Sequence, residues 1–407
     1  YLTERVMGKT WETCVSERIL TPLGMGSTNF GVVEMQKMPD FAAPHEFRDE
    51  AMRKMPFRDL SVVAPAGAIN SSVSDMSRWI ALHLGNGTHE GKTIISKSTL
   101  AELHRPQMVM PSDSVEPAII NIGCAMGWFV AAYRGHLMVE HGGNIDGFSA
   151  LVTMLPKDGI GVVALTNMNS SPLPRMATYH ALDRLLGAEV KDWSSIALGQ
   201  RSVGEAMQKD GKAKKLAARK EGTTASRPIA EYAGEYSHPG YGVTSVAESA
   251  GQLSFAFNGI TVPLNHWHYD VFAGGKNPID PTFEDLQINF RGNLSGDIDA
   301  LEVVFEPTVK PVVFERKASA KMVDAGYIER FVGQYELGPR TFVCSLRGET
   351  LMMMVEGQPA YELVATKEDT FALKGVNGYS VRFLSEGGKI VSAEFIQPDG
   401  VYTAKRR

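Results

Sequence analysis

The sequence is poor in cysteine. It has three, Cys14, Cys124 and Cys344, without the short spacing of a redox or zinc site, so we expect them to pack as small core residues. The net charge is −5, and no basic run is long enough to follow a phosphate backbone, so nucleic acid is not an expected partner. No stretch reaches about 18 uninterrupted apolar residues, and no membrane-spanning helix is predicted.

Apolar residues are plentiful, at 43% of 407, which is enough for two or three packed domains. In the first half, Thr10 and Ser72 are predicted to cap amphipathic helices. The apolar positions recur every three or four residues, as one buried helix face requires. They are Trp11, Val15 and Ile19 in the first helix, and Met76, Trp79, Ile80, His83 and Leu84 in the second. We therefore interpret His83 as a packed histidine and not a catalytic one.

Between residues 126 and 166 the pattern changes to short strands separated by turns. Strands are predicted at 126–132, 137–140, 148–155 and 160–166. Pro156 and Gly159 suit a four-residue loop built on a type I turn. Two further stretches are expected to be loops, the second of them part of a cleft rim: 31–60 and 106–117. Helices followed by an antiparallel meander and another helix predict a sheet flanked by helices.

The stretch His141-Gly142-Gly143-Asn144 is the candidate functional site. Two glycines beside a histidine at the end of a strand leave the backbone bare, so that a ligand can lie against it. The structural alternative is that the glycines mark a bulge or a tight bend.

Several short motifs share an order and spacing that resembles the penicillin-recognising serine hydrolases. That superfamily includes class C β-lactamases, DD-peptidases, D-aminopeptidases and related esterases. The resemblance runs from Tyr1 to about Gly187. Its motifs are Pro22-Leu23-Gly24-Met25, the segment 66–76, Gly127-Trp128-Phe129, Glu140-His141-Gly142-Gly143 and Gly147-Phe148-Ser149. It implies an incomplete α+β domain of the β-lactamase/transpeptidase type, with an antiparallel sheet flanked by helices. It also favours a periplasmic or secreted protein.

The resemblance also implies roles for the candidate site. A serine attacks a carbonyl group while a neighbouring Lys or Tyr takes its proton. His141 is expected to pair with a substrate carboxylate or to adjust the base by its charge. The backbone N–H of Asn144 is expected to form half of the oxyanion hole, and Gly142 and Gly143 to leave the substrate's path free. The expected partner is a small-molecule or peptide substrate, with no cofactor and no metal.

The family's nucleophile motif, Ser-x-x-Lys, is missing, since no serine of the 407 residues has a lysine three positions later. Its second motif, Tyr-x-Asn or Tyr-x-Ser, has only the imperfect stand-in Tyr1-Leu2-Thr3. We therefore expect an upstream segment or a companion chain to carry both motifs. Two hypotheses follow: an acyl hydrolase for an ester, amide or peptide, or a non-catalytic binding protein that uses the same scaffold together with C-terminal barrels.

The second half of the chain repeats itself. Tyr232-Ala233-Gly234-Glu235-Tyr236 corresponds to Phe331-Val332-Gly333-Gln334-Tyr335, at an offset of 99 residues. Each repeat is a series of short alternating strands, which predicts two small antiparallel β-barrels. In the resemblance they correspond to lipocalin-like C-terminal domains. His266 and His268 share a strand face but have no third ligand near, so a surface aromatic cluster is expected there and not a metal site.

Four segments result from these patterns. Residues 1–199 are predicted to be the C-terminal portion of the hydrolase domain, and 200–227 a charged helix followed by a flexible linker. The two barrels are predicted at 228–318 and 325–407.

Overall fold

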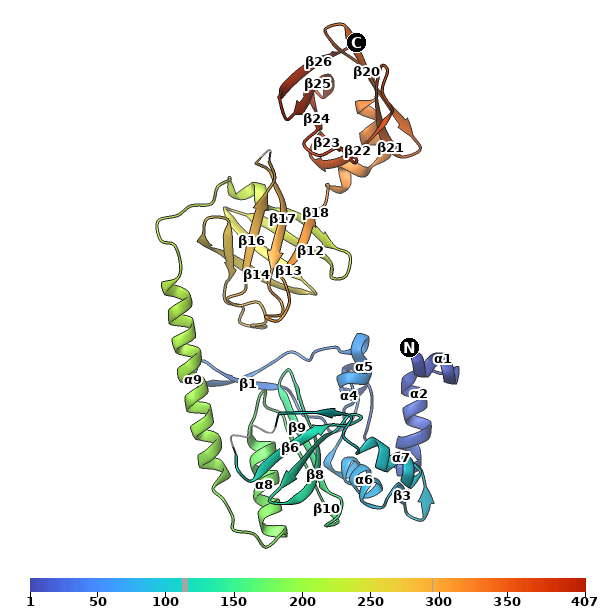
Figure 1. Ribbon diagram of the computed structural model, residues 1–407, viewed down its shortest axis with the longest axis vertical. Coiled ribbons are helices and arrows are strands. Elements are labelled where there is room, and N and C mark those ends of the chain that lie inside the picture. The colour runs from blue at the N-terminus through green and yellow to red at the C-terminus, as the bar shows by residue number, and fades with distance from the viewer. Residues whose placement is uncertain (112–115, 295) are drawn as a thin grey trace. The chain divides into compact units, whose positions relative to one another are not determined.

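The computed structural model of the protein describes residues 1–111, 116–294 and 296–407 (Figure 1). The chain divides into two compact units, Tyr1–Ala213 and Lys214–Arg407, and the boundary falls inside helix α9 (Trp193–Ala217). Within the described ranges, no helix is both long and apolar enough to cross a membrane.

The first unit is built on a six-stranded antiparallel sheet in the order β10-β9-β8-β7-β6-β5. The predicted meander is confirmed, but the strand expected at 137–140 continues to Ile145. The stretch 106–117 is not a simple loop, because β5 pairs with β6 at the sheet edge; residues 112–115 of it lie outside the described residues. The strands are β5 (Met108–Val109), β6 (Ile119–Cys124), β7 (Phe129–Tyr133), β8 (His136–Ile145), β9 (Phe148–Leu155) and β10 (Ile160–Thr166).

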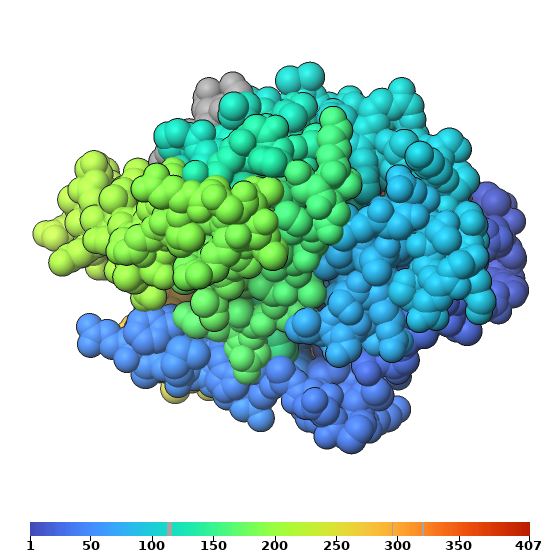
Figure 2. All heavy atoms as spheres, turned by 90° about the horizontal axis from the view of Figure 1, so that it is seen from below, coloured from blue at the N-terminus to red at the C-terminus, as the bar shows by residue number. Residues whose placement is uncertain are grey.

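Helices cover both faces of this sheet because successive strand residues point to opposite sides. The face of Val139 and Met154 packs on helix α6 (Val73–Leu84). The face of Met138 and Leu155 packs on helix α8 (Leu173–Leu185). In Figure 2, atoms of the α6 region (light blue) and of α9 (yellow-green) lie on opposite sides of green atoms from the later strands and α8.

Both predicted helix caps are present. The Thr10 hydroxyl accepts a hydrogen bond from the Thr13 N–H (3.2 Å), and the Ser72 hydroxyl accepts one from the Asp75 N–H (3.2 Å). The first helix is continuous over residues 11–23, as α2, a π-helical turn and α3. The other elements are α1 (Leu2–Met7), α2 (Trp11–Val15), α3 (Thr21–Leu23), α4 (Val32–Met35), β1 (His45–Arg48), β2 (Ala51–Lys54), α5 (Ala64–Gly67), β3 (Thr88–His89), β4 (Lys92–Thr93) and α7 (Lys97–Leu103).

His83 is buried, as predicted for a packed histidine. Its Nδ1 lies 2.9 Å from Nε2 of His104, and its ring meets those of Trp79 and Trp128 edge-on. Burial, together with the charge of His104, lowers the pKa of His83 to about 3. The neutral His83 therefore links the end of α6 to the end of α7 through His104, and to the start of β7 through Trp128.

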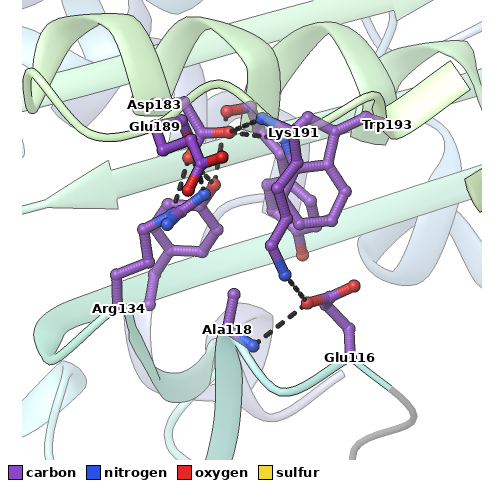
Figure 3. Close-up of polar contacts among 9 residues, drawn as sticks. Glu116, Ala118, Arg134, Asp183, Glu189, Lys191 and Trp193 are labelled. Carbon is purple, nitrogen blue, oxygen red and sulfur yellow. Dashed lines mark hydrogen bonds and ion pairs between the residues drawn. The ribbon is translucent and has the colours of Figure 1, made fainter.

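A buried carboxylate, Asp183, connects three other elements of this unit (Figure 3). It accepts hydrogen bonds from the Tyr133 hydroxyl (2.6 Å), Arg134 Nε (2.8 Å), Trp193 Nε1 (2.8 Å) and the Lys191 N–H (3.2 Å). Burial alone would raise the pKa of Asp183, but these bonds outweigh it and lower the pKa below its usual range. The carboxylate thus joins the β7–β8 turn, the end of α8 and the start of α9.

The second unit holds two closed antiparallel barrels, as predicted, with eight strands each in the described residues. The first barrel closes by pairing Tyr236 with Arg316, the second by pairing Tyr335 with Arg406. The strands of the first barrel are β11 (Gly234–His238), β12 (Gly242–Ser249), β13 (Gln252–Phe257), β14 (Ile260–His268), β15 (Val271–Gly274), β16 (Gln287–Gly292), β17 (Ile298–Val303) and β18 (Val312–Arg316). The second has β19 (Gly333–Leu337), β20 (Arg340–Arg347), β21 (Thr350–Val355), β22 (Tyr361–Lys367), β23 (Thr370–Leu373), β24 (Ser380–Glu386), β25 (Lys389–Gln397) and β26 (Gly400–Arg406).

The sequence repeat corresponds to a structural one. The hydroxyl of Tyr236 donates to the Tyr232 carbonyl (2.7 Å), and Tyr335 donates in the same way to Phe331 (2.8 Å). Strands β15 and β23 begin at positions 99 residues apart. Both interiors are filled by buried aromatic and aliphatic side chains.

Residues 219–226, which include the end of the predicted charged helix and the linker expected to be flexible, are bound to the first barrel. Arg219 Nε donates to the Trp267 carbonyl (2.6 Å), and its guanidinium lies over the Trp267 ring. Thr223 accepts from the N–H of Tyr269 (3.1 Å), and Ser226 donates to Asp270 through its N–H and its hydroxyl. The composition of this segment is that of a flexible linker, but its partners fix it: Trp267 lies in a bulge of β14 between His266 and His268, and Tyr269 and Asp270 lie in the turn that follows. We call residues 219–226 the barrel strap.

Candidate functional site

The site predicted from the sequence lies where strand β8 loses one of its two neighbours. Strand β7 begins at Phe129, which pairs with Glu140, whereas pairing with β9 continues to Ile145. Among the described residues, none pairs with this edge of β8 beyond Glu140, which leaves the edge open there. Ile145 and Phe148 flank a two-residue turn and therefore form a hydrogen-bonded pair. Because such pairs alternate along antiparallel strands, the odd-numbered residues of β8 are the ones that hydrogen-bond to β9. The N–H groups of Gly142 and Asn144 then point to the open edge.

Neither Gly142 nor Gly143 is required by the fold. Both lie in regular pairing with β9, without a register shift, and neither has a positive φ. A Cβ at Gly142 would meet its nearest atom at 3.6 Å, and one at Gly143 at 3.9 Å, which are ordinary contacts. The alternative of a bulge or tight bend is therefore wrong. The missing side chains leave space beside the open edge.

Gly147, in the turn that follows, is a glycine of a different kind. Its φ is +84°, and an added Cβ would lie 2.2 Å from Cβ of Pro44. The close approach arises because residues 41–60 pack against the tip of the β8–β9 hairpin. Arg58 forms an ion pair with Asp146, and the ring of Phe57 stacks on that of Phe148 at 6.4 Å. This stretch, a loop of unknown form in the sequence, thus borders the end of the open edge.

The side chain of Asn144 is engaged within the fold. Its Oδ1 accepts hydrogen bonds from the Ser149 hydroxyl and from the Ser170 N–H, both at 2.7 Å. The Ser149 O–H is shared between Asn144 Oδ1 and the Met168 carbonyl (2.9 Å), and its oxygen accepts from the Ser171 N–H (2.9 Å). These contacts fix Asn144 to the turn after β10, so its backbone N–H is held in place at the open edge. The role of Ser149 was missed by sequence reasoning, which noted it only as part of a motif.

His141 is exposed, and its ring stacks on that of Phe129 with 5.7 Å between centroids. It shares a strand face with Gly143, because alternate residues point the same way. The preceding residue, Glu140, faces α8, where its carboxylate accepts hydrogen bonds from Thr153 (3.1 Å) and Tyr179 (3.4 Å). Burial raises the pKa of Glu140. A charge-bearing group thus lies on each side of the strand, one exposed and one enclosed.

The site is a strand edge. Two surface hollows, of about 280 and 510 Å³, lie elsewhere on this unit, one beside His136 and Asp158 and one beside His180 and Trp193. Within the described residues, no group of three or more His, Cys, Asp or Glu side chains is arranged to bind a metal ion.

Residues 1–186 match the model of the family described as "Beta-lactamase". This part of the chain is similar to the β-lactamase family. Residues 218–316 match a second family, described as "Domain of unknown function (DUF3471)". That match begins one residue before the barrel strap and ends at the last residue of β18, so it covers the first barrel.

Several curated proteins are similar to the chain. An unguisins hydrolase of Aspergillus campestris is 25% identical over 250 residues, covering 59% of this chain and 46% of that protein. Another, from Aspergillus violaceofuscus, is 26% identical over 285 residues, covering 61% and 48%. The human "putative beta-lactamase-like 1" is 27% identical over 180 residues, covering 44% and 33%. The chain thus spans about half the length of the first two relatives.

Among solved structures, the octameric penicillin-binding protein homologue from Pyrococcus abyssi is similar over 77% of this chain and 61% of that one. The identity is 19% and the TM-score 0.42, which is too remote to support an argument about function. The likeness of residues 1–186 to the β-lactamase family therefore rests on the family match.

Proposed function

We propose that the β-lactamase-family domain belongs to a serine hydrolase that forms an acyl-enzyme on an ester, amide or peptide. The observation that carries the proposal is the open edge of β8, beside two glycines that the fold does not need. The family match and the relatives named as hydrolases support hydrolase activity in general.

In this proposal the substrate lies extended along the open edge, where the bare backbone of Gly142 and Gly143 leaves room for it. When the serine oxygen attacks the carbonyl carbon, the carbonyl oxygen becomes an oxyanion. The Asn144 N–H points to that side of the strand and donates to the oxyanion. Such a donor contributes on the order of 3 kcal/mol to transition-state stabilisation. His141, on the same edge, pairs with a carboxylate of the substrate or adjusts the base by its charge.

The nucleophile is proposed to come from residues other than these 407, in an upstream segment or a companion chain. The supporting fact is that no serine of the sequence has a lysine three positions later. A serine without such a base is a weak nucleophile at neutral pH.

The test is labelling with a fluorophosphonate probe, followed by intact-mass measurement, on the 407-residue chain and on the natural protein. The chain alone is expected to remain unlabelled, and the natural protein to carry one label on a serine outside residues 1–407. Stoichiometric labelling of a serine within the 407 residues would show that the nucleophile has been misassigned. A natural protein with the mass of these residues alone, and no label, would favour the non-catalytic binding protein.

A further inference from the structure

Phe129 makes the ring contact that holds His141. The two ring planes differ by 26°, which is a stacked arrangement. As the first residue of β7, Phe129 pairs with Cys124 on one side and Glu140 on the other, so its backbone is fixed. Within the described residues no hydrogen bond or ion pair holds the His141 imidazole. The stack is therefore the contact that orients it.

Packing of the sheet does not explain the Phe129 ring. Its side chain is 42% exposed, although it stands in the middle of a sheet with neighbours on both sides. The adjacent Trp128 is buried and packs in one cluster with Ile80 and Val139. The start of β7 is thus anchored by Trp128, and the exposed ring of Phe129 is left to contact His141.

We propose that Phe129 is a positioning residue for His141. The face of an aromatic ring attracts a cation, so the stack holds the imidazole in place when it is charged. A side chain ordered before binding loses less conformational entropy when it meets an anion. The flat ring thus keeps His141 beside the open edge, ready for an anionic group. The role of His141 in binding an anion rests on the proposed function, whereas the ring contact between Phe129 and His141 does not.

The experiment compares Phe129→Leu and Phe129→Tyr with the unmodified 407-residue chain. Leu keeps an apolar side chain but removes the ring, and Tyr restores the ring. Phe47→Leu is the matched control, since Phe47 is 44% exposed on another strand of the same unit. The first readout is the NMR shift of the His141 ring protons, which a stacked ring displaces. The second is the affinity for N-acetylalanine, a simple carboxylate probe, with His141→Ala as reference.

We expect Phe129→Leu to move the His141 resonances and to weaken N-acetylalanine binding by about two- to fivefold. Phe129→Tyr should restore both, and Phe47→Leu should change neither. Unchanged His141 resonances in Phe129→Leu would show that the two rings do not stack in solution, and would overturn the proposal. Moved resonances with unchanged affinity would overturn the positioning role, provided that His141→Ala does weaken binding. If His141→Ala binds as well as the parent, the anion-binding role in the proposed function fails, and the positioning role fails with it.

Discussion

Replacing Gly143 by alanine is expected to stabilise the protein while impairing its function. The backbone at Gly143 is ordinary extended strand, and an added Cβ would come no closer than 3.9 Å to Cβ of Ala150. At such a position alanine restricts the unfolded chain and raises the free energy of unfolding by about 0.4–1 kcal/mol. For a unit of this size, that corresponds to a rise in Tm of roughly 1–4 °C.

Gly147→Ala is the matched control, only four residues away. Its φ of +84° is unfavourable for alanine, and the new Cβ would lie 2.2 Å from Cβ of Pro44. A left-handed backbone conformation costs about 1–2 kcal/mol, and overpacking about 1–3 kcal/mol more. We expect Gly147→Ala to lower Tm by roughly 5 °C or more.

Activity should respond to Gly143→Ala in the opposite sense to stability. The added methyl group stands on the His141 side of the strand and displaces a substrate that lies along the open edge. A shift of about 1 Å costs on the order of 10²-fold in rate. The assay is kcat/KM of the complete enzyme for an activated ester, beside a thermal melt. A loss of stability like that of Gly147→Ala would refute the claim that the fold does not need Gly143. Unchanged kcat/KM would refute the claim that the substrate passes there.

Between pH 7.5 and 5 the first unit should lose about 2 kcal/mol of unfolding free energy through His83, since a pKa of about 3 keeps the folded imidazole neutral while the unfolded one binds a proton. In denaturant titrations His83→Gln should reduce this loss and the exposed His180→Gln should not. Arg219→Ala should lower the unfolding free energy of the first barrel by about 1 kcal/mol, and Lys209→Ala by far less. Equal effects of the two variants would show that the barrel strap does not stabilise the barrel through Arg219. If His141 binds a carboxylate, His141→Ala should lower kcat/KM for an acidic substrate more than for a neutral ester. A constant ratio would exclude that role.

The elements that could be predicted are those specified by local signals. Helix α6 has a cap at Ser72 and a regular apolar face, and both barrels have alternating strands separated by turns. Elements of two to four residues, such as β1, β2 and β5, were missed because they depend on distant partners. The barrel strap was missed for the same reason, since its Gly, Thr and Ser composition is that of a flexible linker until Trp267 and Asp270 are seen beside it.

The candidate site was predicted only in part. Its residues were identified from the sequence, but the open edge depends on where β7 begins, and that is a property of another strand. Nothing local to Gly142 shows that β7 pairs no further than Glu140. The contribution of Phe129 was hidden for the same reason. The residue belongs to a recognisable motif, yet its contact with His141 arises only when the two strands pair.

The glycines of this stretch show what structure adds to a sequence pattern. Gly142, Gly143 and Gly147 lie within six residues and look equivalent in the sequence. In the structure, Gly147 is required by its own backbone and by Pro44, whereas a side chain would fit at the other two. A glycine costs backbone entropy on folding, about 0.5–1 kcal/mol relative to alanine in a strand. Two such residues that bring the fold no benefit are best explained by something that must lie against them.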